Sequence, residues 1–167
     1  MITILIADDF DLLRQDLTEL LNAQPDMKVV GQASTGAGIV ELAKSVKSDM
    51  ILMDIEMENM SAGIQAAEAI HAADPDRLIL YLTAHDTDRM ILTAMATGAV
   101  DYIVKGAEDE EVLAHIRAAA AGHPMLNARV QSTVIREYDR LRRSEQSLLF
   151  FINSVSKLTS AERDLVR

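Results

Sequence analysis

The sequence contains no cysteine, which excludes a disulfide framework, a thiolate metal site and a thiol nucleophile. It also has no long apolar run at its start, because Asp8 and Asp9 interrupt the first one after a few residues. A signal peptide or a spanning helix needs a longer stretch, so we expect a cytoplasmic protein. The four histidines are scattered without metal-ligand spacing, which argues against a histidine metal site.

Positive charge is scarce over most of the chain. Residues 1–122 hold 21 acidic against 8 basic residues, whereas residues 123–167 hold 5 against 8. Binding to nucleic acid depends on lysine and arginine displacing condensed counterions, so we do not expect the acidic part to touch DNA. With 49% apolar and 25% charged residues, the 167-residue chain has the composition of one soluble globular domain with an appendage.

Short apolar runs alternate with longer segments of helical period, which is the pattern of a parallel sheet wrapped by helices. The expected strands are Ile2–Ala7, Val29–Ala33, Met50–Asp54, Leu78–Thr83 and Asp101–Lys105. The expected helices are Leu12–Leu21, Gly36–Ser45, Gly63–Ala73, Thr87–Thr97 and Asp109–Ala121. Five such units predict one doubly wound α/β domain over residues 1–122, with a five-stranded parallel sheet.

After residue 122 the pattern changes to one long helix from about Asn127 to Val155, and residues 123–157 are expected to form a helical linker. Seven positions follow one another at steps of four and three, a heptad seam interrupted once by Glu145: Val134, Tyr138, Leu141, Glu145, Leu148, Ile152 and Val155. A two-stranded coiled coil and a single amphipathic helix lying on its own domain both fit this spacing. A capped helix start at Thr159 or Ser160 predicts that residues 158–167 begin an output domain.

Polar residues stand where the expected strands end, and ligands of open parallel sheets bind beyond those ends. Asp8 and Asp9 end the first strand, Asp54 the third, Thr83 the fourth and Lys105 the fifth. If the strand order is 2-1-3-4-5, the first and third strands are neighbours and the three carboxylates converge. Such a cluster repels itself, and Mg²⁺, which binds carboxylate and phosphate oxygens, would relieve the repulsion.

A carboxylate beside that ion can attack a phosphoryl donor and become an acyl phosphate. Lys105 would supply a further positive charge, and the Thr83 hydroxyl would donate a hydrogen bond to the phosphoryl group. Each residue alone has an ordinary explanation as a cap, turn, strand or surface residue. Their joint placement at the ends of four strands favours a site, and Asp11 could cap the first helix in place of Asp8 and Asp9.

The sequence closely resembles the response regulator receiver family, with its flavodoxin-like order 2-1-3-4-5, over about residues 1–122. The residues that carry the resemblance are Ile4-Leu5-Ile6-Ala7-Asp8-Asp9, Ile51-Leu52-Met53-Asp54-Ile55-Glu56-Met57, Leu82-Thr83-Ala84 and Gly98-Ala99-Val100-Asp101-Tyr102-Ile103-Val104-Lys105. The resemblance implies that a histidine kinase phosphorylates Asp54. It also implies that Asp8, Asp9 and Asp54 hold Mg²⁺ together with the backbone carbonyl of Glu56.

The resemblance further implies a switch, in which the Thr83 hydroxyl turns toward the phosphoryl group and the Tyr102 ring swings inward. Tyr102 could also be an ordinary half-buried strand aromatic. Such a receiver is not an enzyme in the usual sense, because it catalyses only its own phosphorylation and slow dephosphorylation. Glu56 and His85 each follow a site residue by two positions, and we expect them to tune the lifetime of the acyl phosphate.

Two departures from the family pattern stand beside the site. Met57-Glu58 replaces the usual Met-Pro and Gly63 comes one residue late, which predicts a longer loop. Gly106 follows Lys105 where proline is common. Neither departure removes a reacting group.

Residues 158–167 weakly resemble the opening of a LuxR-type helix-turn-helix domain, which implies a DNA-binding output completed beyond this chain. A sensor histidine kinase and a second copy in a homodimer are the expected partners. A receiver that regulates an enzyme or an RNA-binding domain, or a stand-alone signalling receiver, is the alternative. A flavin module on the same fold is disfavoured because Asp8, Asp9 and Asp11 would repel its phosphate, and an aspartyl phosphatase would need its acid/base residue two positions after the nucleophile.

Overall fold

The computed structural model describes residues 1–84 and 86–166, and side chains as far as residue 155. The elements are β1 Ile2–Ala7, α1 Asp11–Asn22, β2 Met27–Ala33, α2 Gly36–Ser45, β3 Met50–Met53, α3 Ala62–Ala73, β4 Leu78–Thr83, α4 Asp88–Met95, β5 Asp101–Val104, α5 Asp109–Ala120 and α6 Ala128–Val166. Every strand and helix expected in residues 1–122 is present, with its ends within two residues of the prediction.

The sheet has five parallel strands in the order β2-β1-β3-β4-β5, which confirms the predicted fold class. The β1 and β3 strands are neighbours, with Ile4 opposite Met50 and Ala7 opposite Met53. All four residues of β3 are buried, as expected for a strand covered on both faces by helices. This order brings the carboxyl ends of β1 and β3 together at one edge.

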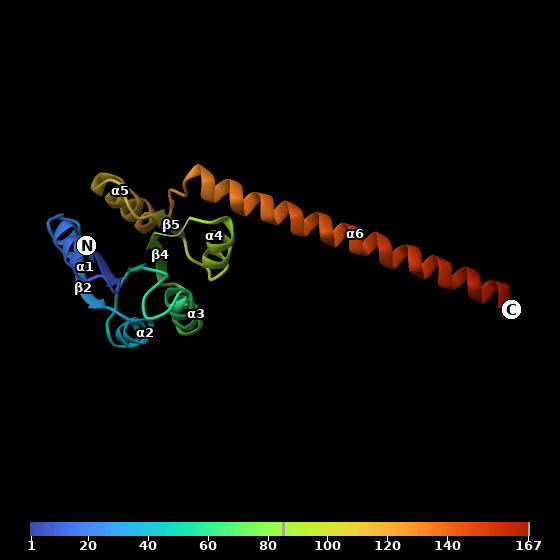
Figure 1. The fold of residues 1–167 in the computed structure, drawn as a ribbon, viewed down its shortest axis with the longest axis horizontal. Coiled ribbons are helices and arrows are strands. Elements are labelled where there is room, and N and C mark those ends of the chain that lie inside the picture. Colours follow the sequence, from blue (N-terminus) through green and yellow to red (C-terminus); the bar gives the residue numbers. More distant parts are fainter. Residues whose placement is uncertain (85, 167) are drawn as a thin grey trace.

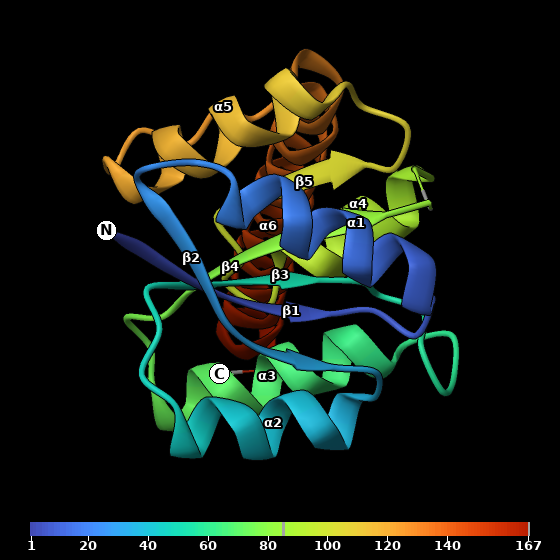
Figure 2. The same ribbon diagram turned by 90° about the vertical axis from the view of Figure 1, so that its left-hand side faces the viewer.

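Helices cover both faces of the sheet, as Figure 2 shows for α1 and α5 on one side and α2 and α3 on the other. One core cluster joins Ile4 and Leu52 of the sheet to Ile116 of α5. The other joins Leu5 and Tyr81 to α2, α3 and α4, and also includes Val130 of α6. Alternate strand residues point to opposite faces, so these two clusters fix the sheet between its helical layers.

The α6 helix begins against α4 and then projects away from the domain (Figure 1). Val130 and Thr133 are buried, and Val134 packs against the core from a partly buried position. The first turns of α6 therefore lie on the chain's own domain, as expected for the single amphipathic helix that was one of the two predicted alternatives. The helix continues without a break to Val166, so the new helix expected at Thr159 or Ser160 is wrong as an element boundary.

None of the helices in the described ranges is both long enough and apolar enough to cross a membrane.

Candidate functional site

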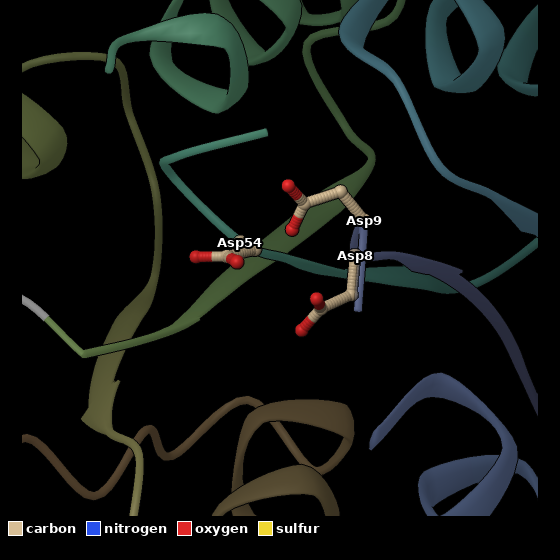
Figure 3. A group of neighbouring side chains, drawn as sticks. All are labelled: Asp8, Asp9 and Asp54. Atoms are coloured by element: carbon tan, nitrogen blue, oxygen red, sulfur yellow. The ribbon is translucent and has the colours of Figure 1, made fainter. Parts of the chain in front are cut away.

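Three carboxylates meet where β1 and β3 end. Asp8 and Asp54 are buried, Asp9 is exposed, and one oxygen from each lies within 4.8 Å of the others. Figure 3 shows the three side chains gathered around a common space. The structure thus brings together the acidic residues that the sequence placed at neighbouring strand ends.

The backbone of the sheet sets this convergence. The Asp54 N–H donates to the Ala7 carbonyl at 2.9 Å, and the Asp8 N–H donates to the Ala33 carbonyl at 3.1 Å. These bonds extend the strand ladders by one residue on each side of β1. Asp8 and Asp54 consequently leave the sheet at the same level, with their side chains on the same edge.

Lys105 reaches this cluster from the end of β5. Its Nζ lies 3.0 Å from Asp8 Oδ2 and 3.0 Å from Asp54 Oδ2, and its backbone N–H donates to the Thr83 carbonyl at 2.7 Å. The next residue, Gly106, has a φ of 103°, which proline cannot adopt. The chain therefore makes a different turn here from the one that a proline would impose.

Burial and charge oppose each other at this site. Burial raises the pKa of Asp54 and Asp8 raises it further, and these effects outweigh Lys105 and a Thr83 hydrogen bond, which lower it. Burial lowers the pKa of Lys105, but its hydrogen bonds with Asp54 and Asp8 outweigh that effect and the pKa is raised. One ammonium group against three carboxylates leaves an excess of negative charge that a cation would neutralise.

The donor set fits Mg²⁺. This ion binds carboxylate oxygens at about 2.0–2.1 Å, so two oxygens on the same ion lie at most about 4.2 Å apart. The observed limit of 4.8 Å is close to that value, and small side-chain rotations would close the difference. Glu56 is exposed and is not a member of this carboxylate group, so its main-chain carbonyl remains its expected ligand atom.

Arg14 positions the loop that carries the first two acidic residues, a role that the sequence did not indicate. Its Nη1 donates to the Asp8 carbonyl at 2.7 Å, while its Nη2 pairs with Asp11 Oδ1 at 2.6 Å. Asp8 Oδ1 accepts the Phe10 N–H at 2.9 Å. The prediction that Asp11 caps α1 is wrong, because Phe10 occupies the N-cap and Asp11 is the first helical residue. The spacing of Asp11 and Arg14 could have indicated their ion pair.

The longer loop after β3 is held by contacts of Glu58 and Gly63, the two residues of this loop that depart from the family pattern. Both carboxylate oxygens of Glu58 accept the Gly36 N–H at 2.8 Å, which ties the loop to the first residue of α2. The Gly63 N–H donates to the Ile55 carbonyl at 2.8 Å. A Cβ added at Gly63 would lie 2.0 Å from the Asp54 carbonyl oxygen, so only glycine permits this approach of α3.

The two expected switch residues are both buried. Thr83 ends β4 with no exposed surface, and Tyr102 of β5 is equally enclosed, its ring centroid 6.2 Å from that of Tyr81. Tyr102 is therefore not the half-buried aromatic of the alternative prediction. Burial raises the pKa of Tyr102 to about 12. His85, expected to face the pocket mouth, lies outside the described residues.

Two histidines have partners that the sequence did not indicate. His115 Nδ1 lies 2.5 Å from Asp101 Oδ2, and both side chains are buried between β5 and α5. Burial raises the pKa of Asp101, and the hydrogen bond with His115 opposes that rise. The ring nitrogens of His71 lie 2.6 Å from the Thr97 carbonyl and 2.9 Å from the Arg77 carbonyl. These histidines join elements around β4 and β5, away from the carboxylate cluster.

Residues 4–117 match the response regulator receiver domain family. The transcriptional regulatory protein LiaR of Bacillus subtilis is 38% identical over 149 residues, which cover 89% of this chain and 69% of LiaR. The uncharacterized transcriptional regulatory protein YxjL of the same organism is 39% identical over 141 residues, 84% of this chain. That match spans 64% of the length of YxjL, just under two thirds. The nitrate/nitrite response regulator protein NarL of Escherichia coli is 30% identical over 165 residues, 99% of this chain and 73% of NarL.

Solved structures agree with these relatives. A LuxR-family two-component response regulator from Aurantimonas has a TM-score of 0.74 and 25% identity, covering 81% of this chain and 96% of that one. The response regulator domain of Thermotoga maritima CheB has a TM-score of 0.66 and 34% identity, covering 72% of this chain and 97% of that one. The chain therefore belongs to the response regulator receiver domain family, and its relatives are regulators of the LuxR/NarL type.

Proposed function

We propose that this chain is the phosphoacceptor part of a two-component response regulator, which takes a phosphoryl group from a histidine kinase onto Asp54 with Mg²⁺. The observation that carries the proposal is the surrounding of Asp54, with Asp8 and Asp9 oxygens within 4.8 Å and the Lys105 Nζ at 3.0 Å. Family membership supports the same reaction.

In the proposed transfer, a carboxylate oxygen of Asp54 attacks the phosphorus of a phosphohistidine. The new O–P bond forms as the P–N bond breaks, and the imidazole leaves with the electron pair of that bond and is protonated by solvent. Lys105 neutralises charge on the phosphoryl oxygens, and the Thr83 hydroxyl donates a hydrogen bond to one of them. Asp8, Asp9, Asp54 and the Glu56 carbonyl would hold Mg²⁺, which would supply further charge neutralisation for the phosphoryl oxygens.

The direct test is labelling with acetyl phosphate as a small phosphodonor. Wild-type protein is expected to be labelled only with Mg²⁺ present, and Asp54→Asn to abolish the labelling. Asp101→Asn is the matched control, because it changes another buried aspartate away from the site and should leave the labelling intact. Labelling of the Asp54→Asn variant, or none in the wild type with Mg²⁺, would overturn the proposal.

The receiver is not proposed to turn over a separate substrate, since the phosphoryl group stays on the chain until water removes it. Glu56 and His85 are proposed to tune that hydrolysis by orienting the attacking water. Replacing either with alanine should change the half-life of the acyl phosphate. An unchanged half-life in both variants would remove them from this role.

Phosphorylation is proposed to move Thr83 and Tyr102 and to alter the face formed by α4, β5 and α5. The expected consequence is stronger dimerisation, which controls a DNA-binding output in the cytoplasm. The names of LiaR and YxjL as transcriptional regulatory proteins support this output over an enzymatic or RNA-binding one. Sedimentation with a beryllium fluoride mimic should show a lower dimer dissociation constant; the same value without the mimic would dismiss the dimer switch.

A further inference from the structure

The part of α6 beyond α4 carries a large apolar surface. Every residue from 140 to 155 is exposed. Seven large apolar side chains in this stretch are 45% to 75% exposed: Leu141, Leu148, Leu149, Phe150, Phe151, Ile152 and Val155. Apolar side chains gathered in this way mark an interaction surface.

The spacing of these residues favours another helix as the occupant. Tyr138, Leu141, Leu148, Ile152 and Val155, with Glu145 in the remaining place, follow one another at alternate steps of three and four. This period of 3.5 residues is the one that keeps a seam facing a partner helix in a coiled coil. The same stripe starts at Val134, which packs on the receiver. No described part of the chain covers the stripe from Tyr138 to Val155.

We propose that residues 138–155 of α6 pair in parallel with the same segment of a second copy of this chain. The proposal goes beyond the phosphoacceptor function, because neither Asp54 nor Mg²⁺ takes part in it. Two identical stripes fit each other as knobs into holes. Leu149 and Phe151 flank the seam and widen the apolar contact, while Phe150 lies on the outer side and stays exposed.

Charge favours the parallel direction. Glu137 and Arg142 flank the seam on opposite sides, and they stand five residues apart. A parallel pair places Glu137 beside Arg142 of the second copy, which is the usual ion pair between flanking positions of parallel coiled coils. An antiparallel pair sets like flanks together and loses this contact.

Glu145 limits the strength of the pair. It occupies an inward position of the seam, where two carboxylates from the two copies would face each other. A single polar residue at such a position fixes register and oligomer state at a cost in stability. The pair is therefore weak and defined in register, which allows changes elsewhere in the protein to shift its population.

The first test measures association by sedimentation equilibrium in the Asp54→Asn background without a phosphodonor. The mass should rise with concentration from one chain to two. Leu148→Asp should abolish the dimer, while Phe150→Asp, the same kind of change two residues further on the outer side, should retain it. Glu145→Leu should lower the dimer dissociation constant by about tenfold or more. Far-ultraviolet circular dichroism of each variant checks that the helix is retained.

The second test uses the absence of native cysteine to determine direction. In a parallel pair, Leu141→Cys and Val155→Cys should each form a disulfide with the same position of the second copy, and Ser147→Cys on the outer side should not. Cross-linking of Leu141→Cys with an Ile152→Cys protein in a mixture, without cross-linking of Leu141→Cys or Val155→Cys to itself, would show an antiparallel pair, because residues at equal distances from the middle of the seam then face each other. That result, a monomer at every concentration, or a persistent dimer in Leu148→Asp would overturn the proposal. Failure of Asp54 labelling would not affect it, since these measurements need no phosphoryl group.

Discussion

Gly63 brings the start of α3 against the backbone of Asp54, and an added Cβ would lie 2.0 Å from the Asp54 carbonyl oxygen. The Asp54 backbone lies on one side of this contact and α3 on the other, so neither can move far to accommodate an added Cβ. We expect Gly63→Ala to lower the free energy of unfolding by about 1–3 kcal/mol and to slow acetyl phosphate labelling by displacing Asp54.

Denaturant unfolding and the labelling rate measure the two effects. Gly122→Ala is the control for backbone strain without a steric clash, because a Cβ there meets nothing within 4 Å, whereas its φ of 84° is left-handed and that of Gly63 is not. Gly122→Ala should lower the free energy of unfolding by about 1 kcal/mol and leave the labelling rate unaltered. Equal effects of both variants would mean that the close approach to Asp54 is unimportant.

Asp101 provides a prediction on pH. Burial raises its pKa in the folded protein above the ordinary value of about 3.9. The folded state therefore holds this proton more tightly, and the stability that it contributes at low pH is lost as pH rises through the folded pKa. Asp101→Asn, which keeps an oxygen for His115, should become more stable relative to the wild type as pH rises from about 4 to 7.

Unfolding curves at several pH values measure this trend. Asp26→Asn is the opposite control, because the hydrogen bond with Arg117 lowers the pKa of Asp26. That variant should lose stability relative to the wild type as pH rises, and only weakly, since the pair is exposed to solvent. Trends of the same sign in the two variants would contradict the assignment for Asp101.

Single residues differ in how far the sequence reveals them. Asp8, Asp54 and Lys105 could be placed together because each ends a buried strand, and strand ends of a parallel sheet share one edge. The contacts of Glu58 with Gly36 and of Gly63 with Asp54 could not be placed, because they depend on the path of an irregular loop. No periodicity describes such a path.

At the scale of elements, α4 and α6 are joined by both packing and charge. Val130 is 1% exposed, whereas Arg129 pairs with Asp86 at 2.7 Å and Asp88 at 3.3 Å through half-exposed side chains. Buried packing should dominate, because exposed ion pairs contribute no more than about 1 kcal/mol. Val130→Ala should therefore weaken the contact by about 1–3 kcal/mol, and Arg129→Ala by less.

Hydrogen exchange at the first turns of α6 reports this contact directly. Exchange should accelerate more in Val130→Ala than in Arg129→Ala, and added salt should affect the wild type only slightly. Ser132→Ala is a control on the exposed side of the same turn. A larger effect of Arg129→Ala would show that charge, not packing, holds α6 on α4.

Element boundaries were predictable where apolar runs alternate with helical periods, as they do through residues 1–122. The end of α6 was not, because capping residues such as Thr159 and Ser160 are compatible with a helix interior when the backbone continues. The sequence also did not reveal where the packed part of α6 ends and the projecting part begins, because the same apolar heptad stripe runs through both parts. Only the position of α4 decides where the covered part ends.

For the whole molecule, the uneven charge leads to a prediction on nucleic acid. Residues 1–122 hold 21 acidic against 8 basic residues, and this body would repel phosphates from any adjoining segment. We expect the chain as it stands to show no saturable binding to duplex DNA in fluorescence anisotropy at physiological salt. Saturable binding with a steep salt dependence would place a DNA-binding surface within these 167 residues.

The continuity of α6 gives the molecule a mechanical property. A helix of 39 residues is about 58 Å long, and of its side chains up to residue 155 those that pack on the receiver lie near its beginning. A tilt of about 10° at α4 would sweep the far end through roughly 10 Å, so the helix acts as a lever arm that converts a small rearrangement beside Thr83 into a large displacement of that end.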